Sequence, residues 1–538
     1  MAAGFTGQAL QVWEDWKAFW NREKKLRWFA AALMALLYGI RLTQGDIFVD
    51  SDIMINRPEE LMFSWYGHRR FGLILIKKLF FFVRLTPYLA NALFVLTFWL
   101  AAIGVCFCMY EWSGRREALR KSSFLFVLFF LSAPCFAEQF NFLLQAFEMA
   151  LAICFCVFAA FCAGLRIYEK KSVLWLAPAL FFMVWSFASY QAFPAFYAAL
   201  VLISYIHVYL YRKECCGLRE GLWQAGLFVL GFVCYMASSQ AIASWQGASS
   251  SYVSAMFYWG TVPMEECLAN IQMDFQRIYQ AEWPTFFSRW FLYAGPLALA
   301  LLLVRGFRRN SRKFPCLVLA LLLLAVTPVL ITLITAMPQP IRGQLTYPLV
   351  YAYSAYIVYG ELAGMADGGG LLNREKARRF ASGRTWKGVL ALAAAAAVLI
   401  GWKQCVTMSQ LWETAHETYV SDVMNAGRMY GELCRAADGE QISDCQVAFV
   451  GAQGAKLGGT PLMGDAIGHS VFQWDADSSI GVSGRAASFF EMLGMPVGMP
   501  DAESYAEAKS ACEDRPVWPA EGSVFRIRDG LVAVKLSD

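Results

Sequence analysis

Long runs of apolar residues, separated by short polar segments, follow one another from residue 27 to residue 402. A helix needs about 20 mainly apolar residues to cross the hydrocarbon layer of a membrane. Eleven apolar runs, the shortest of about 15 residues, therefore predict eleven membrane-spanning helices. The runs cover residues 27–44, 88–110, 122–136, 140–163, 172–188, 192–211, 221–241, 286–304, 316–336, 345–365 and 388–402.

Basic residues gather in alternate loops between these runs. Loops rich in lysine and arginine tend to stay in the cytoplasm. The pattern predicts a cytoplasmic amino terminus and, because the number of runs is odd, an external carboxyl terminus. Six segments on the predicted cytoplasmic side hold 26 of the 46 basic residues: 17–27, 115–121, 166–171, 212–219, 305–313 and 374–387.

The runs and the charges together divide the chain into three parts. Residues 1–26 mix aromatic with charged side chains and predict a cytoplasmic amphipathic segment at the membrane surface rather than a signal peptide. Residues 27–402 form the membrane domain. Its external segment 44–87 contains an apolar stretch interrupted by lysine and arginine, which is typical of interfacial helices, and 242–285 is a second external segment. Residues 403–538 form an external tail long enough for a small domain.

The tail has the pattern of a small α/β domain. The stretch QVAFVGAQG predicts a buried strand, and VFRIRDGLVAVKL predicts two strands joined by a turn at Asp529 and Gly530. Helices are expected near 406–436 and 485–493. Cys434 and Cys445 flank a polar turn, where an oxidising exterior permits a disulfide, although free thiols are an equal alternative.

Composition narrows the class of protein further. Hydrophobic residues make up 58% of the chain and charged residues 16%, so a soluble enzyme is excluded. The net charge of +5 indicates no nucleic-acid partner. The fold class is an α-helical polytopic membrane protein, and the lipid bilayer is its first partner.

Polar residues at the external ends of the runs are the candidates for chemistry, because burying a polar group at a membrane must be compensated. The predicted cytoplasmic loops offer mainly lysine and arginine, whereas the external ends combine carboxylates, amides and arginines. Their shared side favours one outward-facing site. The candidates are Asp46, Asp50, Asp52, Arg69, Arg70, Glu138, Gln139, Tyr190, Gln191 and Arg342.

Carboxylates beside arginines suit the transfer of a group from a lipid-linked phosphate donor. Asp50 or Asp52 is the candidate base that removes a proton from the attacking hydroxyl. Arg69, Arg70 and Arg342 are candidates for holding the donor phosphate. Each group also has a structural reading: Asp-Ser-Asp as a helix cap, and arginines that reach toward lipid headgroups. The remaining candidates are expected to bind substrate, namely Asp46, Glu138, Gln139, Tyr190 and Gln191.

Several short motifs occur in a fixed order along the chain. An acidic cluster follows the first run, a tryptophan and a Gly-His-Arg-Arg element come next, and a Pro-x-x-x-Glu-Gln-Phe element, a Tyr-Gln pair and a Pro-x-Arg element follow. The tail carries the strand VAFVG and a Phe-x-Trp-Asp element. The residues concerned are Asp50, Asp52, Trp65, Gly67, His68, Arg69, Arg70, Pro134, Glu138, Gln139, Tyr190, Gln191, Pro340, Arg342, Phe472, Trp474 and Asp475.

In these motifs the chain resembles the serotype-converting Gtr type II membrane glucosyltransferases, within the wider GT-C fold. The resemblance implies a polyprenyl-phosphate-linked sugar donor, with glucose as the sugar. It implies a cell-surface glycan, such as O antigen, as the acceptor. It also implies that the segment 44–87 builds the active site.

Two other functions and one cofactor question stay open at this point. A transporter or flippase for a lipid-linked glycan would show internal repeats and charges in mid-membrane, and neither is evident. A non-catalytic assembly or sensor protein would act through its tail. Asp50 and Asp52 offer oxygen ligands to Mg²⁺ or Mn²⁺. Because arginines can hold a single phosphate, we expect no obligatory metal or other cofactor.

Overall fold

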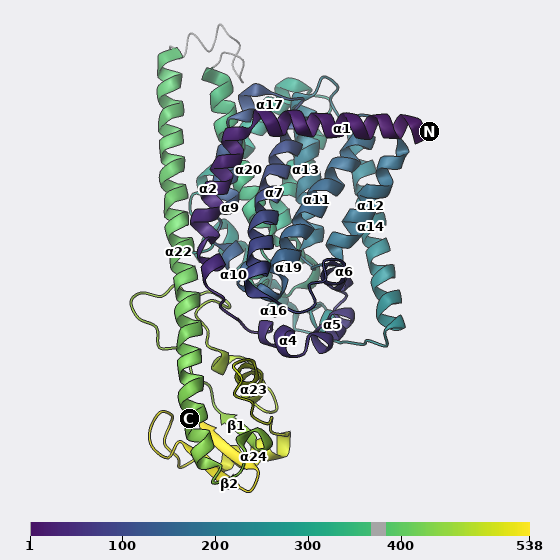
Figure 1. The fold of residues 1–538 in the computed structure, drawn as a ribbon. Helices are drawn as coiled ribbons and strands as arrows, with labels where there is room; N and C mark the ends of the chain where they lie inside the picture. Colours follow the sequence, from purple (N-terminus) through teal and green to yellow (C-terminus); the bar gives the residue numbers. More distant parts are fainter. Residues whose placement is uncertain (1, 367–382) are drawn as a thin grey trace.

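The computed structural model describes residues 2–366 and 383–538, and 69% of the chain is helical. Long helices stand side by side in one bundle, and a smaller part of the chain that contains the strands lies beyond one end of it (Figure 1). The buried apolar residues form one large cluster in the bundle and a second that joins the segment after the first helices to the tail.

Seven helical segments of the described residues are long and apolar enough to cross a membrane. An eighth results if α9 (Ser123–Leu131) and α10 (Cys135–Asn141), which meet at 53°, count as one broken span. The chain therefore has the helices of a multi-pass membrane protein. The seven are α7 (Pro87–Trp112), η1 with α11 (Leu143–Ile167), α13 (Phe193–Tyr211), α14 (Leu218–Trp245), α17 (Phe291–Arg309), α18 to α19 (Phe314–Thr335) and α22 (Gly383–Ala436).

Three further predicted spans coincide with helices that also stand in the bundle (Figure 1) but are shorter or less apolar. They are α2 (Lys24–Tyr38) with α3 (Ile40–Thr43), α12 (Leu176–Phe187) and α20 (Thr346–Ala366). α20 carries five tyrosines, four of them buried, which fits a helix enclosed by its neighbours rather than one facing lipid. The count of eleven spans stays a prediction.

The basic loops meet at one end of the bundle, here called the basic end. Helix α1 (Ala2–Arg22) lies across this end (Figure 1). Arg120 pairs with Glu23 at 3.3 Å, so the segments 17–27 and 115–121 lie together, and Arg212 pairs with Glu169 at 2.7 Å, so 166–171 and 212–219 do too. Part of the last segment, namely Arg374, Lys376, Arg378 and Arg379, lies outside the described residues.

Short helices gather at the opposite end, here called the tail end. The segment 44–87 folds into α4 (Ser51–Asn56), α5 (Pro58–Gly67) and α6 (Phe71–Leu79). A buried ion pair fixes α6 against the bundle, because Lys77 Nζ donates to Glu148 Oε1 of α11 at 2.7 Å. The segment 242–285 contains α15 (Tyr252–Ala255) and α16 (Met264–Tyr279).

Helix α22 connects the bundle to the tail. Its 54 residues form one continuous helix, which at 1.5 Å per residue is about 80 Å long. The predicted boundary at residue 403 therefore falls inside a helix. The first part of α22 is apolar and lies along the bundle, and the second part extends into the tail (Figure 1).

The tail contains a three-stranded sheet in the order β1-β3-β2. Strand β1 (Gln446–Val450) pairs in parallel with β3 (Leu531–Lys535), and β2 (Val524–Arg528) pairs antiparallel to β3 through the turn at Asp529 and Gly530. Helices α23 (Ser483–Met492) and α24 (Ala502–Ala511) pack against β1. The remaining described elements are α8 (Glu117–Arg120), η2 (Val173–Trp175), η3 (Thr327–Val329), η4 (Ile341–Gly343), η5 (Ile442–Asp444) and η6 (Val471–Gln473).

The structure decides between the two alternatives left open for the cysteines of the tail. Cys434 and Cys445 are both free. Cys434 is exposed on α22, whereas Cys445 is buried with its sulfur 3.3 Å from Glu440 Oε2. The tail is therefore held together by its apolar core and sheet rather than by this bridge.

Candidate functional site

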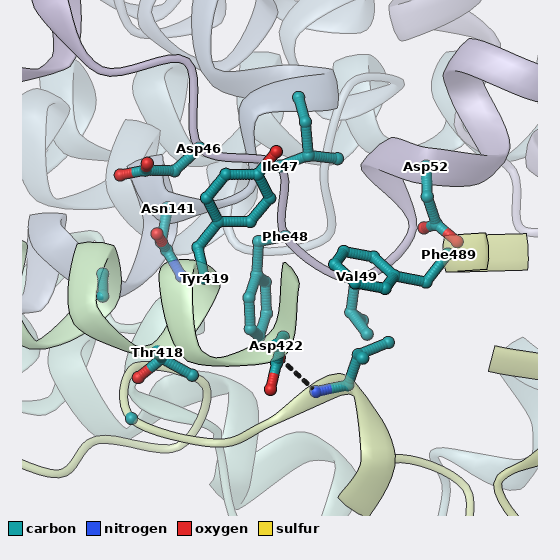
Figure 2. A pocket seen from close by; sticks show the side chains of 13 residues that line it. Asp46, Ile47, Phe48, Val49, Asp52, Asn141, Thr418, Tyr419, Asp422 and Phe489 are labelled. Atoms are coloured by element: carbon teal, nitrogen blue, oxygen red, sulfur yellow. Dashed lines mark hydrogen bonds between the residues drawn. The ribbon is translucent and has the colours of Figure 1, made fainter. Parts of the chain in front are cut away.

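A cavity lies where three distant parts of the chain meet at the tail end. The residues after the first helices form one side, the middle of α22 forms another, and the tail closes the third (Figure 2). The cavity has a volume of about 20 Å³, which is room for about one water molecule. Its lining combines three carboxylates with aromatic side chains: Asp46, Ile47, Phe48, Val49, Asp52, Asn141, Ala415, Thr418, Tyr419, Asp422, Gly468, Val471 and Phe489.

Asp52 is the predicted catalytic residue that the structure places in this cavity. It lies in the first turn of α4 with 2% of its surface exposed. Among the described residues neither carboxylate oxygen accepts a hydrogen bond of full geometry, and the Ser488 hydroxyl and the backbone amide of Ile53 are the donors beside it. Burial raises the pKa of Asp52, and this effect outweighs the Ser488 hydroxyl and the Arg485 guanidinium, which lower it. A raised pKa and a free oxygen suit a group that accepts a proton.

Asp50, the other predicted base, has a different environment. Its carboxylate accepts a hydrogen bond from Arg485 Nη1 at 2.6 Å, and Arg485 also donates to Asp475 at 2.6 Å. Asp50 has a φ of 69°, a left-handed conformation that aspartate tolerates better than most residues. The ion pair ties the segment 44–87 to α23 of the tail. The Asp50 carboxylate is therefore held in an ion pair, whereas no ion pair within 4 Å involves Asp52 among the described residues.

Asp46 lies deeper, with two basic neighbours that sequence reasoning missed. His416 Nδ1 of α22 lies 2.8 Å from Asp46 Oδ1, and Arg41 Nη1 lies 3.5 Å from Oδ2. Arg41 is 2% exposed and stacks over the ring of Trp412 at 5.0 Å. Arg41 is a charged residue inside the first apolar run, near its end, and this position is the signal that could have marked it. His416 lies beyond the predicted membrane domain, and no pattern in the sequence marks it as a site residue.

Asp422 is a third cavity carboxylate that the sequence analysis did not identify. Its oxygens accept hydrogen bonds from Ser470 Oγ at 2.6 Å and from the backbone amide of Val471 at 2.8 Å, and Figure 2 marks the second of these bonds. These bonds connect α22 to the tail. Asp422 follows an amphipathic pattern within a long helix, so nothing local in the sequence distinguishes it from a solvated acid.

Arg70, Tyr190 and Gln191 come together as a second group at the tail end. Arg70 Nε donates to Gln191 Oε1 at 3.0 Å, and the guanidinium stacks over the Tyr190 ring at 4.8 Å. Arg69 donates to Gln240 Oε1 at 3.1 Å. None of these residues lines the cavity. Burial and the charge of Arg70 lower the pKa of His68 to about 4, so the imidazole is neutral at neutral pH.

Glu138, Gln139 and Arg342 lie around α10. Glu138 is fully buried, and its carboxylate accepts hydrogen bonds from the backbone amides of Ala466 at 3.0 Å and Ile467 at 3.1 Å. Gln139 is also fully buried, and its amide has no hydrogen-bond partner among the described residues. Arg342 lies over the Phe142 ring at 5.1 Å. Substrate binding by Glu138 and Gln139 stays a prediction, and the structure gives Glu138 a partner in the tail.

No group of three or more histidine, cysteine, aspartate or glutamate side chains among residues 2–366 and 383–538 has the arrangement of a metal site. The three cavity carboxylates come from the segment 44–87 and from α22, and each faces different partners. What the cavity offers directly is a buried proton acceptor beside aromatic surfaces.

Comparison with known families identifies the chain. A family model described as glucosyl transferase GtrII matches residues 39–360, which is more than half of the sequence. The chain belongs to the GtrII family. This family is described as one of glucosyltransferases, as the resemblance implied. No match is found among curated proteins or among solved structures.

The GtrII match divides the cavity into two parts. Asp46, Asp52 and Asn141 lie within the matched residues. The lining from α22 and from the tail, including Asp422 and Phe489, lies beyond residue 360. The tail motifs of the resemblance are likewise outside the match. This GtrII chain therefore completes its cavity with residues that the family model does not describe.

Proposed function

We propose that the chain is a membrane glycosyltransferase that moves a hexose, namely glucose, from a polyprenyl-phosphate-linked donor to a cell-surface glycan. GtrII membership supports the reaction class. The observation that carries the proposal is Asp52, a buried carboxylate to which no residue in 2–366 and 383–538 donates a hydrogen bond of full geometry, in a cavity at the end of the helix bundle. A group of this kind is costly to keep unless it has a chemical use.

In the proposed reaction Asp52 accepts the proton of the attacking acceptor hydroxyl. The hydroxyl oxygen forms a bond to the anomeric carbon of glucose, and the bond from that carbon to the phosphate oxygen breaks. The phosphate leaves with the bonding electrons and stays on the polyprenyl chain. Asp50 is the weaker candidate for the base because its oxygen is already paired with Arg485.

Arginines at the tail end are proposed to stabilise the departing phosphate. Arg70 donates hydrogen bonds to Gln191 and Tyr252. Both partners are neutral, so they do not cancel its positive charge. No ion pair within 4 Å involves Arg69, Arg70 or Arg342 in the part of the chain that the structure describes. Because a monophosphate carries little charge, these arginines suffice without an obligatory metal. Activity should survive chelation, and loss with rescue by Mg²⁺ would refute this.

The proposed arrangement in the cell follows the distribution of charge. The basic end faces the cytoplasm, the tail end with the cavity faces outward, and the eleven predicted spans form a GT-C-like membrane domain with an external α/β tail. An external site has no supply of nucleotide sugars, so a donor carried on a lipid fits this side of the membrane. The acceptor is then the glycan of the same cell surface.

A reconstitution experiment tests the proposed function against its alternative. The purified chain in lipid vesicles receives polyprenyl-phosphate glucose with a label on the sugar, together with surface polysaccharide from a host that lacks the gene. We expect labelled polysaccharide and free polyprenyl phosphate. If the labelled lipid only changes leaflet and stays intact, the chain is a flippase and the proposal is wrong.

A further inference from the structure

A second pocket, here called the interhelix pocket, opens between α22 and the residues at the start of α17. It has a volume of about 410 Å³, which falls within the usual range for small-molecule sites. Its floor includes the buried side chains of Phe286 and Gln404. A ligand can reach it from outside the bundle, because four of its lining residues are exposed: Arg289, Trp290, Tyr293 and Lys403.

Arg289 and Lys403 give the interhelix pocket a positive charge. Arg289 comes just before α17, and Lys403 lies on α22. In the part of the chain that the structure describes, neither side chain has an ion pair within 4 Å or a hydrogen bond, and the pocket lining contains no aspartate or glutamate. Two positive charges without a partner attract an anion, and phosphate oxygens suit an arginine especially well.

Both charges lie at the height where lipid headgroups are expected at the tail end. Sixteen positions separate Lys387 from Lys403 on α22, a rise of about 24 Å, and the residues between them carry no charge. α17 has 19 residues, a rise of about 28 Å, and it ends in basic residues at the basic end. Each rise is close to the hydrocarbon thickness of a membrane, about 30 Å. Exposed Trp290 and Tyr293 are typical of the membrane–water interface.

The position of the interhelix pocket separates its ligand from the glucose donor. Ala415 is the first α22 residue in the lining of the Asp52 cavity, and it lies twelve positions beyond Lys403, about 18 Å along the helix. In the proposed reaction the phosphate leaves the same carbon that the deprotonated hydroxyl attacks, so the phosphate and the base lie close together. A phosphate held at Lys403 is too far from Asp52 for this reaction.

We infer that the interhelix pocket binds the phosphate headgroup of an anionic phospholipid in the membrane leaflet at the tail end. This choice of lipid rests on the proposed function, which places the reaction at Asp52. The acyl chains then lie along the exposed apolar side chains of α22, such as Val398 and Leu399. The lipid bridges α17 and α22. Because α22 carries Tyr419 and Asp422 to the Asp52 cavity, the lipid stabilises the helix that completes this cavity.

Native mass spectrometry of the purified full chain tests this lipid site. The chain in detergent is titrated with phosphatidylglycerol, which is anionic, or with phosphatidylcholine, which is not. We expect one phosphatidylglycerol to bind about tenfold or more tightly than phosphatidylcholine. The double variant Arg289→Gln with Lys403→Gln should lose this preference, whereas Arg289→Lys with Lys403→Arg should keep most of it. A preference unchanged in the glutamine variant would overturn the inference.

Lys78→Gln with Arg84→Gln is the matched control. Both residues are exposed in the segment 44–87, at the same end of the bundle and outside the interhelix pocket. The control removes the same charge and should keep the preference for phosphatidylglycerol. An equal loss in the control would show a general effect of surface charge and overturn the inference. Thermal unfolding in phosphatidylcholine nanodiscs should be the same for wild type and both glutamine variants, which shows that they fold.

Two competitors identify the source of the bound phosphate. Inorganic phosphate lacks acyl chains and should not displace phosphatidylglycerol, and displacement at equal concentration would overturn the assignment to a lipid. Polyprenyl phosphate should not displace it either. If it does, with the same dependence on Arg289 and Lys403, the pocket is a donor or product site and the assignment to a phospholipid is wrong. These measurements involve no sugar transfer, so their failure leaves the proposed function to its own test in vesicles.

Discussion

Asp52 differs from an ordinary surface carboxylate because burial removes water, and in the described part of the chain no hydrogen bond of full geometry replaces it. Its raised pKa means that the folded chain keeps the proton to a higher pH than the unfolded chain does. The free energy of unfolding therefore falls as the pH rises above the ordinary carboxyl pKa, and this loss is complete above the folded-state pKa. Asp52 makes the folded chain less stable at neutral pH.

Asp52→Asn should stabilise the protein while it removes activity. At neutral pH we expect the free energy of unfolding to rise by about 1 to 3 kcal/mol, because no charge is then buried unpaired. The gain should disappear below about pH 3.5, where the wild-type carboxyl is protonated in both states. Thermal unfolding in detergent at several pH values measures this, with exposed Glu59→Gln as the control. A variant less stable than wild type at neutral pH would contradict it.

Some residues of the site could be predicted from the sequence alone. It could name Asp46, Asp50 and Asp52 because acids at the end of an apolar run are unusual. It could not choose among them, since that depends on Arg485, which is 435 residues from Asp50. His416 and Asp422 lie in a helix whose pattern is ordinary. Only the tertiary structure brings them to the cavity.

At the scale of elements, α6 depends on the ion pair of Lys77 and Glu148. Both side chains are almost fully buried, at 0% and 1% exposed. Lys77→Met would leave the Glu148 carboxylate buried without its partner, so we expect a loss of about 3–5 kcal/mol in the free energy of unfolding. Denaturation in detergent checks this value.

The double variant Lys77→Met with Glu148→Leu is the matched control for α6. It removes both charges, so most of the stability should return. A single variant as stable as wild type would show that the ion pair does not hold α6 in place. The aromatic rings of Trp65 and Phe82, 6.0 and 5.2 Å from the Lys77 ammonium, would then be its main support.

Helix boundaries show where the pattern of the sequence is informative and where it is not. The apolar runs predicted α7, α11 and α13 closely, because lipid exposure and burial both select apolar residues. The predicted boundary between membrane domain and tail, at residue 403, lies within α22 and stays a prediction, since a change in polarity does not end a helix. α20 is buried among other helices, so tyrosines replace some of the aliphatic residues expected of a span.

At the scale of the whole molecule, the two ends of the bundle differ in charge, and this difference predicts the orientation in the membrane. Cys434 is free and exposed on the tail part of α22. A maleimide that cannot cross membranes should label it in intact cells, and Cys434→Ser should remove the label. Cys215, at the basic end, should react only after permeabilisation. Labelling of Cys434 only in permeabilised cells would contradict the proposed orientation.

The whole molecule also explains why the tail could not be assigned a role from its sequence. Its strands and the turn at Asp529 and Gly530 were predictable from local pattern. The return of residues 462–471 to Glu138 was not, because the contact spans 328 residues and uses backbone amides, which leave no mark in the sequence. The same contact makes the tail a part of the cavity.

The central claim is glucosyl transfer with Asp52 as the base, and the surface glycan of living cells tests it most directly. A host that lacks the gene is complemented with wild type, Asp52→Asn or Glu59→Gln, and its surface polysaccharide is analysed for a side-branch hexose. Wild type and Glu59→Gln should restore the hexose, whereas Asp52→Asn should not, although it reaches the membrane in equal amount. A hexose restored in full by Asp52→Asn would contradict the account.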